Sequence, residues 1–280
     1  MKTLNFTKMS GAGNDFVIME ASALKGIDVK QLTTEVCDRT NGVGADGLLI
    51  LDKSKKADYK MRIINADGSE AEMCGNGSRC LIEYIVRTKN PKNSTISLDT
   101  LAGIVLGEVL KKAVKVRLSD PRDYAPDIKI EVSDRKIKVH YIDTGVPHTI
   151  VFVDDLDKIE INTIGPMIRT HEEFKPRGTN VNFVEQIKED LIHVRTYERG
   201  VEAETKACGT GSVASAIVTY LKANPKLKNF QNAVMQVKTT GGDILEVSFD
   251  ITSGKASNVW LKGHVRLIAE GKYYFNSFKS

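Results

Sequence analysis

The sequence predicts an α/β protein of the α+β class, made of two pseudo-symmetric duplicated domains. Each domain is expected to be a mostly antiparallel sheet or barrel wrapped around a long central helix. Three observations predict this fold. A Cys-Gly-polar-Gly-Ser motif occurs once in each half, each half combines many short strand-like runs with one long apolar helix, and 280 residues suffice for two domains of ordinary size.

The repeated motif lies at Cys74-Gly-Asn-Gly-Ser78 and again at Cys208-Gly-Thr-Gly-Ser212, 134 positions apart (208 − 74). Other residues pair at this spacing or within one position of it: Gly11 with Gly145, Asn14 with His148, Gly44 with Gly178, and Asn65 with Glu198. A single short match would be weak. A nearly constant spacing over most of both halves indicates a duplicated architecture.

In the first half, short runs of β-branched and aromatic residues between turn residues predict the strands. They are expected at 4–7, 16–20, 48–52, 59–65, 95–100, 104–110 and 114–118. Helical periodicity predicts helices at 29–37 and 77–87, and the second of these is apolar on a broad face. A helix of this kind is expected to be enclosed by the sheet.

The second half repeats this arrangement. Strands are expected at 136–143, 149–153, 180–187, 191–197, 233–239, 244–250 and 256–262, and a helix at 211–222. The Pro-rich stretch 121–126 is expected to link the halves, and 265–275 to return as a strand of the first domain. The expected domains are therefore 1–120 with 265–280, and 121–264.

Composition excludes several classes of protein. The chain is 41% hydrophobic and 27% charged with a net charge of +4, and its basic residues are scattered, so we expect no nucleic-acid partner. It has no run of 18 apolar residues, which argues against a membrane span, and its first residues lack a secretory apolar core. Four cysteines without a secretory signal indicate reduced thiols and a cytoplasmic location.

Cys74 and Cys208 each precede Gly-x-Gly at an expected helix start. A helix N-terminus carries unpaired N–H groups and partial positive charge, which favours thiolate over thiol and can hold a substrate carboxylate. Inversion at a carbon requires a base on one face and an acid on the other, and two thiols can supply both. Cys37 and Cys80 have no counterpart in the other half and are interpreted as core residues.

No Cys-x-x-Cys pair or metal-ligand spacing is present, so neither a metal nor a cofactor is expected. The alternative for the two motif cysteines is that they are small packed residues at helix starts. The repetition of both the cysteines and their glycines favours chemistry at a carbon centre.

At this point the residues resemble the diaminopimelate epimerase family. The resemblance covers nearly the whole chain and follows family order. The matching blocks are Met9–Phe16, Gly42–Gly47, Asn65–Gly68, Cys74–Gly77, Gly145–His148, Gly178–Asn180, Tyr197–Gly200 and Cys208–Gly211. Two positions depart from some relatives, which have Asn at Val146 and Gln at Gly47.

This resemblance implies a pyridoxal-independent isomerase that interconverts LL- and meso-2,6-diaminopimelate in lysine biosynthesis. It implies a cytoplasmic homodimer with a small-molecule substrate and an active site in the interdomain cleft. It implies Cys74 and Cys208 as base and acid, with His148 and Glu198 as residues that assist ionisation. The implied substrate contacts are Asn14, Asn65, Gly75, Asn76, Asn180, Glu198, Arg199, Gly209 and Thr210.

Each implied contact also has a simpler interpretation. The asparagines occur where turns are expected, Glu198 and Arg199 would suit a surface ion pair, and His148 would suit a structural role. Two other functions remain open. One is another cofactor-independent two-cysteine racemase, such as a histidine racemase, which the departure at Val146 leaves possible. The other is a redox switch in which Cys74 and Cys208 form a reversible disulfide.

Overall fold

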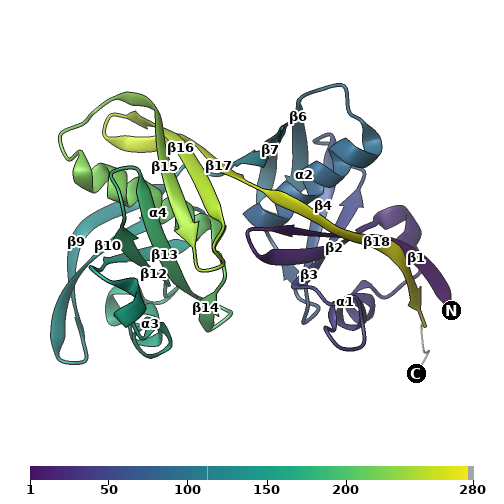
Figure 1. Ribbon diagram of the computed structural model, residues 1–280, viewed down its shortest axis with the longest axis horizontal. Coiled ribbons are helices and arrows are strands. Elements are labelled where there is room, and N and C mark those ends of the chain that lie inside the picture. Colours follow the sequence, from purple (N-terminus) through teal and green to yellow (C-terminus); the bar gives the residue numbers. More distant parts are fainter. Residues whose placement is uncertain (112, 277–280) are drawn as a thin grey trace. The chain divides into compact units, whose positions relative to one another are not determined.

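The computed structural model describes residues 1–111 and 113–276. The chain divides into two compact units, Met1–Val116 with Gly263–Ser280, and Arg117–Lys262. Residues 277–280, which the expected first domain included, lie outside the described residues. Figure 1 labels elements of both units, and each unit is described by itself.

Strands of the first unit form one sheet in the order β18-β1-β2-β3-β4-β6-β7-β8. Neighbours are antiparallel except β2 with β3 and β4 with β6, which are parallel. The strands are β1 (Lys2–Gly11), β2 (Asn14–Glu20), β3 (Gly47–Asp52), β4 (Tyr59–Asn65), β5 (Glu70–Ala71), β6 (Thr95–Thr100), β7 (Gly103–Leu110), β8 (Ala113–Arg117) and β18 (Val265–Phe275).

The second unit repeats this topology. Its order is β9-β10-β11-β12-β13-β15-β16-β17, with β11–β12 and β13–β15 parallel and the other neighbours antiparallel. The strands are β9 (Arg122–Val132), β10 (Arg135–Asp143), β11 (Pro147–Phe152), β12 (Asn180–Gln186), β13 (Leu191–Glu198), β14 (Ala203–Thr205), β15 (Phe230–Thr239), β16 (Ile244–Thr252) and β17 (Lys255–Gly263). The same pairing pattern in both units is the structural form of the sequence repeat.

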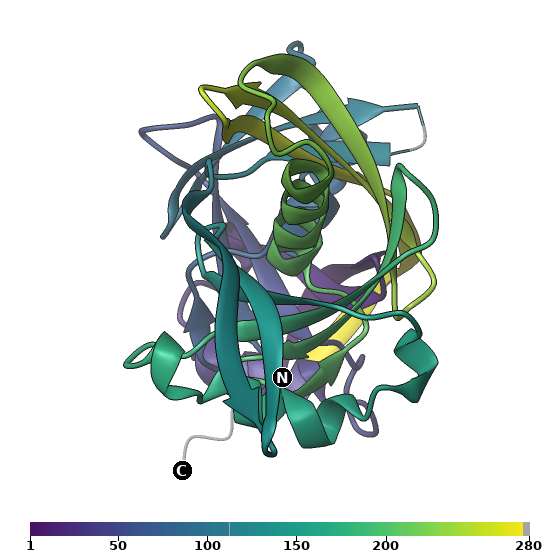
Figure 2. The same cartoon turned by 90° about the vertical axis from the view of Figure 1, so that its left-hand side faces the viewer.

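Each sheet curves around one long helix. In the first unit α2 (Gly75–Lys89) packs against β1, β2, β3, β4, β7 and β18. In the second, α4 (Gly209–Ala223) packs against β10, β11, β12, β13, β15 and β16, and Figure 2 shows strands on all sides of it. Residues 211–219 of α4 are buried without interruption, which is the pattern of a helix enclosed by apolar neighbours.

Shorter helices cover the outside of each unit. In the first unit α1 (Val29–Cys37) is capped by Asp28, whose carboxylate accepts from the N–H groups of Lys30 and Gln31. The second unit has α3 (Ile161–Arg169) in the equivalent place between its parallel strands. Short 3-10 helices lie at Ala21–Leu24, Leu156–Lys158 and Glu172–Phe174.

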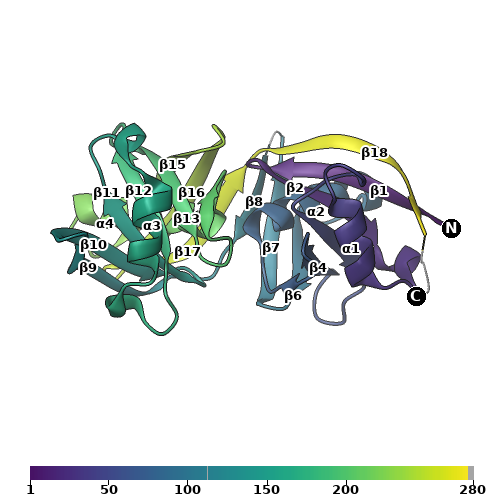
Figure 3. The ribbon, with the colours of Figure 1, turned by 90° about the horizontal axis from the view of Figure 1, so that it is seen from below.

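These elements confirm the predicted fold class of two duplicated, mostly antiparallel α+β units, each built around a central helix. The prediction for the tail is also confirmed, because β18 pairs with β1 along its length, as Figure 3 shows. The observed unit boundary lies between Val116 and Arg117, whereas the boundary expected from sequence followed Asp120.

One prediction was wrong. The stretch 121–126 is not a linker, because Arg122–Pro126 begins the strand β9, which pairs with β10. Its two prolines suggested a loop, but a strand at the end of a sheet tolerates proline. Asp123 and Asp127 have positive φ angles of 56° and 55°, so the backbone of this strand is irregular at both positions. The regular alternation of apolar and polar residues by which a strand is recognised in a sequence is therefore missing here.

Candidate active site

Cys74 is the N-cap residue of α2. Its backbone is extended (φ −145°, ψ 115°), and its Sγ accepts a hydrogen bond from the N–H of Gly77 at 3.4 Å. The first turn that follows, Gly75 to Gly77, is buried. The sulfur therefore lies against the positive end of the helix dipole, where negative charge is stabilised.

Asn14 lies beside this thiol at the start of β2. Its Oδ1 accepts from Cys74 Sγ at 3.7 Å, and its Nδ2 donates to Asp46 Oδ2 at 2.5 Å. The tight turn before it, Ala12-Gly13, has positive φ at both residues, the geometry of a two-residue hairpin loop. The turn and the Asp46 carboxylate together orient the amide toward the thiol.

Charged side chains surround Asp46. Arg39 bonds Asp46 at 2.6 Å and Asp15 at 2.8 Å, and Lys8 pairs with Asp15 at 3.0 Å. Burial alone would raise the pKa of Asp15, but hydrogen bonds from Arg39 and Lys8 outweigh it and hold that pKa below its usual value. Asp15 and Asp46 therefore share the Arg39 guanidinium within a network of opposite charges.

The other expected residues of this unit lie at two places. Asn65 ends β4 and is exposed, with its Nδ2 donating to Ser69 Oγ at 3.0 Å. Asn76 is buried in the first turn of α2, and its Oδ1 accepts from the fully buried Arg79 at 2.7 Å. The side chain of Asn76 is thus engaged within the helix and does not face a ligand through its Oδ1.

Cys208 is the N-cap residue of α4 and is 8% exposed. Its Sγ lies 3.5 Å from the hydroxyl of Thr210, and, unlike Cys74, it accepts no capping hydrogen bond from the helix. The carbonyl of Thr210 accepts from the hydroxyl of Thr144 at 3.1 Å, in the turn before β11. This bond ties the first turn of α4, with Gly209 and Thr210, to the turn that precedes His148.

His148 is fully buried in β11. Burial lowers its pKa to about 3, an effect that Arg199 adds to and that Asp143 and a hydrogen bond with Asn182 oppose. Asn182 Nδ2 lies 3.1 Å from His148 Nδ1. His148 is therefore a neutral imidazole at physiological pH, held by an amide on the adjacent strand β12.

Asn180, Glu198 and Arg199 are brought together at the ends of β12 and β13. Asn180 Oδ1 accepts from the main-chain N–H of Arg199 at 2.7 Å, and Arg199 donates to the carbonyl of Arg177 at 2.8 Å. Burial raises the pKa of Glu198, and the Thr205 hydroxyl opposes this shift. A carboxyl group with a raised pKa is suited to proton transfer near neutral pH.

The remaining cysteines are core residues, as predicted. Cys37 and Cys80 are buried, and burial raises the pKa of each thiol to about 12. Among residues 1–111 and 113–276, no group of three His, Cys, Asp or Glu side chains is arranged to hold a metal ion. Within the same residues, no helix is long and apolar enough to span a membrane.

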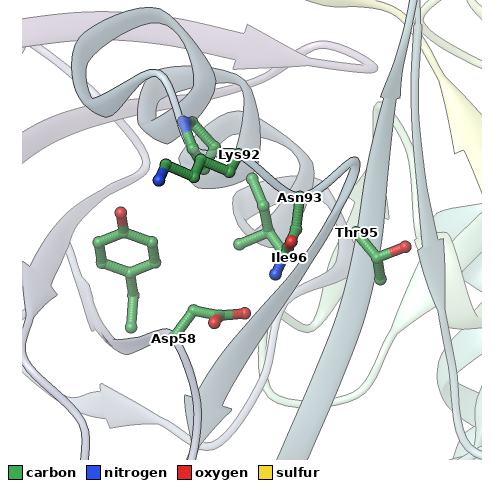
Figure 4. A pocket seen from close by; sticks show the side chains of 7 residues that line it. Asp58, Lys92, Asn93, Thr95 and Ile96 are labelled. Atoms are coloured by element: carbon green, nitrogen blue, oxygen red, sulfur yellow. The ribbon is translucent and has the colours of Figure 1, made fainter.

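A surface pocket of about 250 Å³ lies elsewhere in the first unit, beside the loop between α2 and β6. Figure 4 shows Asp58, Lys92 and Asn93 around it. Its lining includes none of the residues that the sequence pointed to. The hydroxyl and N–H of Ser97 in β6 donate to the Asp58 carboxylate at 2.6 Å and 2.8 Å, so this carboxylate is bonded to the strand.

Sequence reasoning missed three residues that contact the predicted ones. Asp46 bonds Asn14, Asn182 bonds His148, and Thr144 bonds the first turn of α4. The sequence carried some signal for Asn182, because it alternates with Asn180 and is flanked by the apolar residues Val181 and Phe183. The other two contacts depend on turns that meet only in the folded unit.

Comparison with known proteins gives one consistent family. The family model for Diaminopimelate epimerase matches residues 6–122 and 140–266. A protein named diaminopimelate epimerase from Aquifex aeolicus (strain VF5) is 41% identical over 282 residues, covering 96% of this chain and 97% of that protein. One of that name from Carboxydothermus hydrogenoformans is 39% identical, covering 97% of this chain and all of that protein.

Among solved structures, a phenazine biosynthesis protein of the PhzF family from Bacillus anthracis matches with a TM-score of 0.75 at 19% identity. The match covers 98% of this chain and 100% of that one. At this identity the likeness shows the fold alone.

Proposed function

Because the chain belongs to the diaminopimelate epimerase family of isomerases, we propose that it interconverts LL- and meso-2,6-diaminopimelate by a two-cysteine mechanism without pyridoxal phosphate. The observation that carries this proposal is the matched position of the two thiols. Cys74 and Cys208 are each the N-cap residue of the enclosed helix of their unit, each followed by Gly-x-Gly.

In the proposed reaction, one cysteine as thiolate removes the α-hydrogen as a proton and becomes a thiol. The electron pair of the broken C–H bond is left on the α-carbon and delocalised into its carboxylate. The other cysteine, initially a thiol, delivers its proton to the opposite face and becomes a thiolate. The roles exchange in the reverse reaction, so no redox partner is needed.

The helix N-termini are proposed to stabilise the charge that develops. The main-chain N–H groups at Gly75 and Asn76, and at Gly209 and Thr210, are proposed to donate to the reacting carboxylate. Asn14, Asn65 and Asn180 are proposed to bind the polar groups of the substrate. Arg199 is proposed to bind the distal carboxylate, to which a guanidinium can donate two parallel hydrogen bonds.

Glu198 is proposed to assist ionisation of a thiol, which its raised pKa supports. His148 is also proposed to assist ionisation of a thiol, and it would do so as a buried, neutral imidazole. Lysine biosynthesis, a cytoplasmic location and a homodimer remain predictions.

The test is NMR of the reduced protein with LL-diaminopimelate in D2O. Conversion to the meso isomer with deuterium at the α-carbon is expected for the wild type and for Cys80→Ala, which removes a core thiol from α2. Cys74→Ala and Cys208→Ala should each lose at least about 10³-fold in rate, because each removes one of the two proton-transfer groups.

Two outcomes would redirect the proposal. Exchange of the α-hydrogen of histidine, with none on diaminopimelate, would support the two-thiol chemistry but assign a different substrate. The departure from some relatives at Val146 leaves this outcome open. Full activity after both thiols have been oxidised to a disulfide would exclude the two-thiol mechanism.

A further inference from the structure

A buried amide holds the ring of His148. Asn182 and His148 are both fully buried, on the adjacent parallel strands β12 and β11. Asn182 Nδ2 lies 3.1 Å from His148 Nδ1 and 3.2 Å from the carbonyl oxygen of Thr149, and its Oδ1 accepts from the hydroxyl of Thr196 at 3.0 Å. All the hydrogen-bonding atoms of this amide are therefore engaged.

These partners decide which way the amide is turned. A main-chain carbonyl can only accept, so the atom facing Thr149 must be the NH2 group. One of its two hydrogens goes to that carbonyl, and the other is available to His148 Nδ1. Since Nδ1 accepts, the proton of the neutral imidazole must be on Nε2.

The Nε2 atom of His148 is buried and has no hydrogen-bond partner among the residues that the structure describes. A buried N–H without an acceptor is costly, and such groups often mark a functional position. The charged groups that act on this ring are Asp143 and Arg199, and neither is bonded to it.

Gly211 connects this arrangement to the reactive helix. A Cβ built on Gly211 would lie 2.3 Å from Asn182 Oδ1 and 3.3 Å from Cys208 Sγ. The amide of Asn182 therefore packs directly against the first turn of α4, beside Cys208. The last glycine of the Cys-Gly-Thr-Gly motif is needed here to make room for that amide.

We propose that Asn182 is a positioning residue that keeps His148 in the Nε2–H tautomer, so that His148 donates a hydrogen bond to an anion at the reacting centre and does not act as a base. The acceptor is a thiolate or a substrate carboxylate. The tautomer is independent of the proposed function, whereas its use in the reaction rests on that function.

The first test is long-range 1H–15N correlation NMR of the wild-type protein, with ring-labelled histidine, at pH 7. We expect Nε2 to be the protonated nitrogen of His148 and Nδ1 the unprotonated one. The reverse assignment, or a mixture of tautomers, would overturn the proposal. This spectrum needs no substrate, so its outcome does not depend on the proposed function.

The second test changes the partner of Nδ1. Asn182→Asp has the same shape, but its carboxylate can only accept, so Nδ1 should become protonated. We expect kcat to fall about 10- to 100-fold, KM to change less than about 3-fold, and the pH profile to shift, because the donor at Nε2 is lost or becomes cationic. Asn182→Ala should give mixed tautomers and an intermediate loss.

Thr149→Val is the matched control. It removes a buried hydrogen bond, that between the hydroxyls of Thr149 and Thr179 at 3.1 Å, without touching the His148 ring. The control should keep the tautomer and the pH profile. An equal loss of kcat in this control, or an unchanged tautomer in Asn182→Asp, would show that Asn182 is merely structural. If Asn182→Asp does not fold, the tautomers measured in Asn182→Ala and in the wild type still decide whether Asn182 sets the tautomer of His148.

A third measurement identifies the acceptor from the chemical shift of the Nε2 proton. A downfield shift that appears only when diaminopimelate is added identifies a substrate carboxylate. A shift that is present without ligand and is lost in Cys208→Ala or Cys74→Ala identifies a thiolate. Either result supports the donor role, and a proton that responds to neither change contradicts it.

Discussion

The two motif cysteines occupy equivalent positions in equivalent folds, yet their surroundings differ. Cys74 accepts a hydrogen bond from an N–H of its own helix and lies beside Asn14, whose amide donates to the Asp46 carboxylate. Cys208 has a neighbouring threonine hydroxyl, and the counterpart of Asn14 is the buried, neutral His148. The duplicated scaffold thus supplies the same helix end twice, and neighbouring side chains make the two halves chemically distinct.

Apart from loss of the thiols themselves, the largest effect is expected from placing a charge in the first half. Asn14→Asp would set a carboxylate against Asp46 and about 3.7 Å from Cys74 Sγ, because that is where Asn14 Oδ1 lies. Like charges this close disfavour a thiolate, and we expect kcat to fall about 100-fold. Steady-state kinetics measure this. Asn14→Ala, which removes the amide without adding charge, should lose less, and an equal loss would assign the effect to the amide.

The matched glycines of the two motifs should respond differently to alanine. At Gly211 a Cβ would lie 2.3 Å from Asn182 Oδ1, whereas at Gly77 it would lie 3.1 Å from a flexible methyl of Leu49. We expect Gly211→Ala to lower the free energy of unfolding by about 1–3 kcal/mol. Gly77→Ala should cost less than about 1 kcal/mol, since alanine favours the helix. Urea unfolding compares them, and equal losses would contradict the difference.

One part of the pH dependence of the second half comes from His148. Its pKa is lowered to about 3, below the unfolded value of 6.5, so the unfolded chain binds this proton first as the pH falls. The contribution of His148 to stability is constant above about pH 6.5 and falls by up to about 1.4 kcal/mol per pH unit from there toward pH 3. NMR titration should show no change of the His148 ring from pH 8 to 5, and a midpoint near 6.5 would contradict this.

The smallest effect is expected at the ion pairs of the first half. The pKa of Asp15 is lowered, so its contribution to stability is present above the unfolded pKa and is lost as pH falls through the folded one. Arg39→Gln removes one partner, and because Arg39 is largely exposed we expect a loss below about 1 kcal/mol at pH 7. The loss should vanish in strong acid, where urea unfolding of both proteins should agree.

Local patterns in the sequence were sufficient for most of the fold. The segments β4, β6 and α1 of the first unit were predicted from their residue patterns with the observed bounds. Sequence reasoning missed α3 because Gly165-Pro166 suggests a break. The structure accommodates that pair, since Gly165 packs so closely on Tyr197 that a Cβ would lie 2.6 Å from its ring.

The candidate active site, like the fold, has features that the sequence predicted and features that only the structure decided. The repeat by itself determined that two cysteines start two enclosed helices, because a motif of cysteine and glycines at a helix start is local and its duplication is visible as a spacing. Only the tertiary structure decided the state of His148, because burial and the direction of the Asn182 amide depend on strands and turns far apart in the chain. Protonation and hydrogen-bond direction are properties of surroundings, and surroundings exist only after folding.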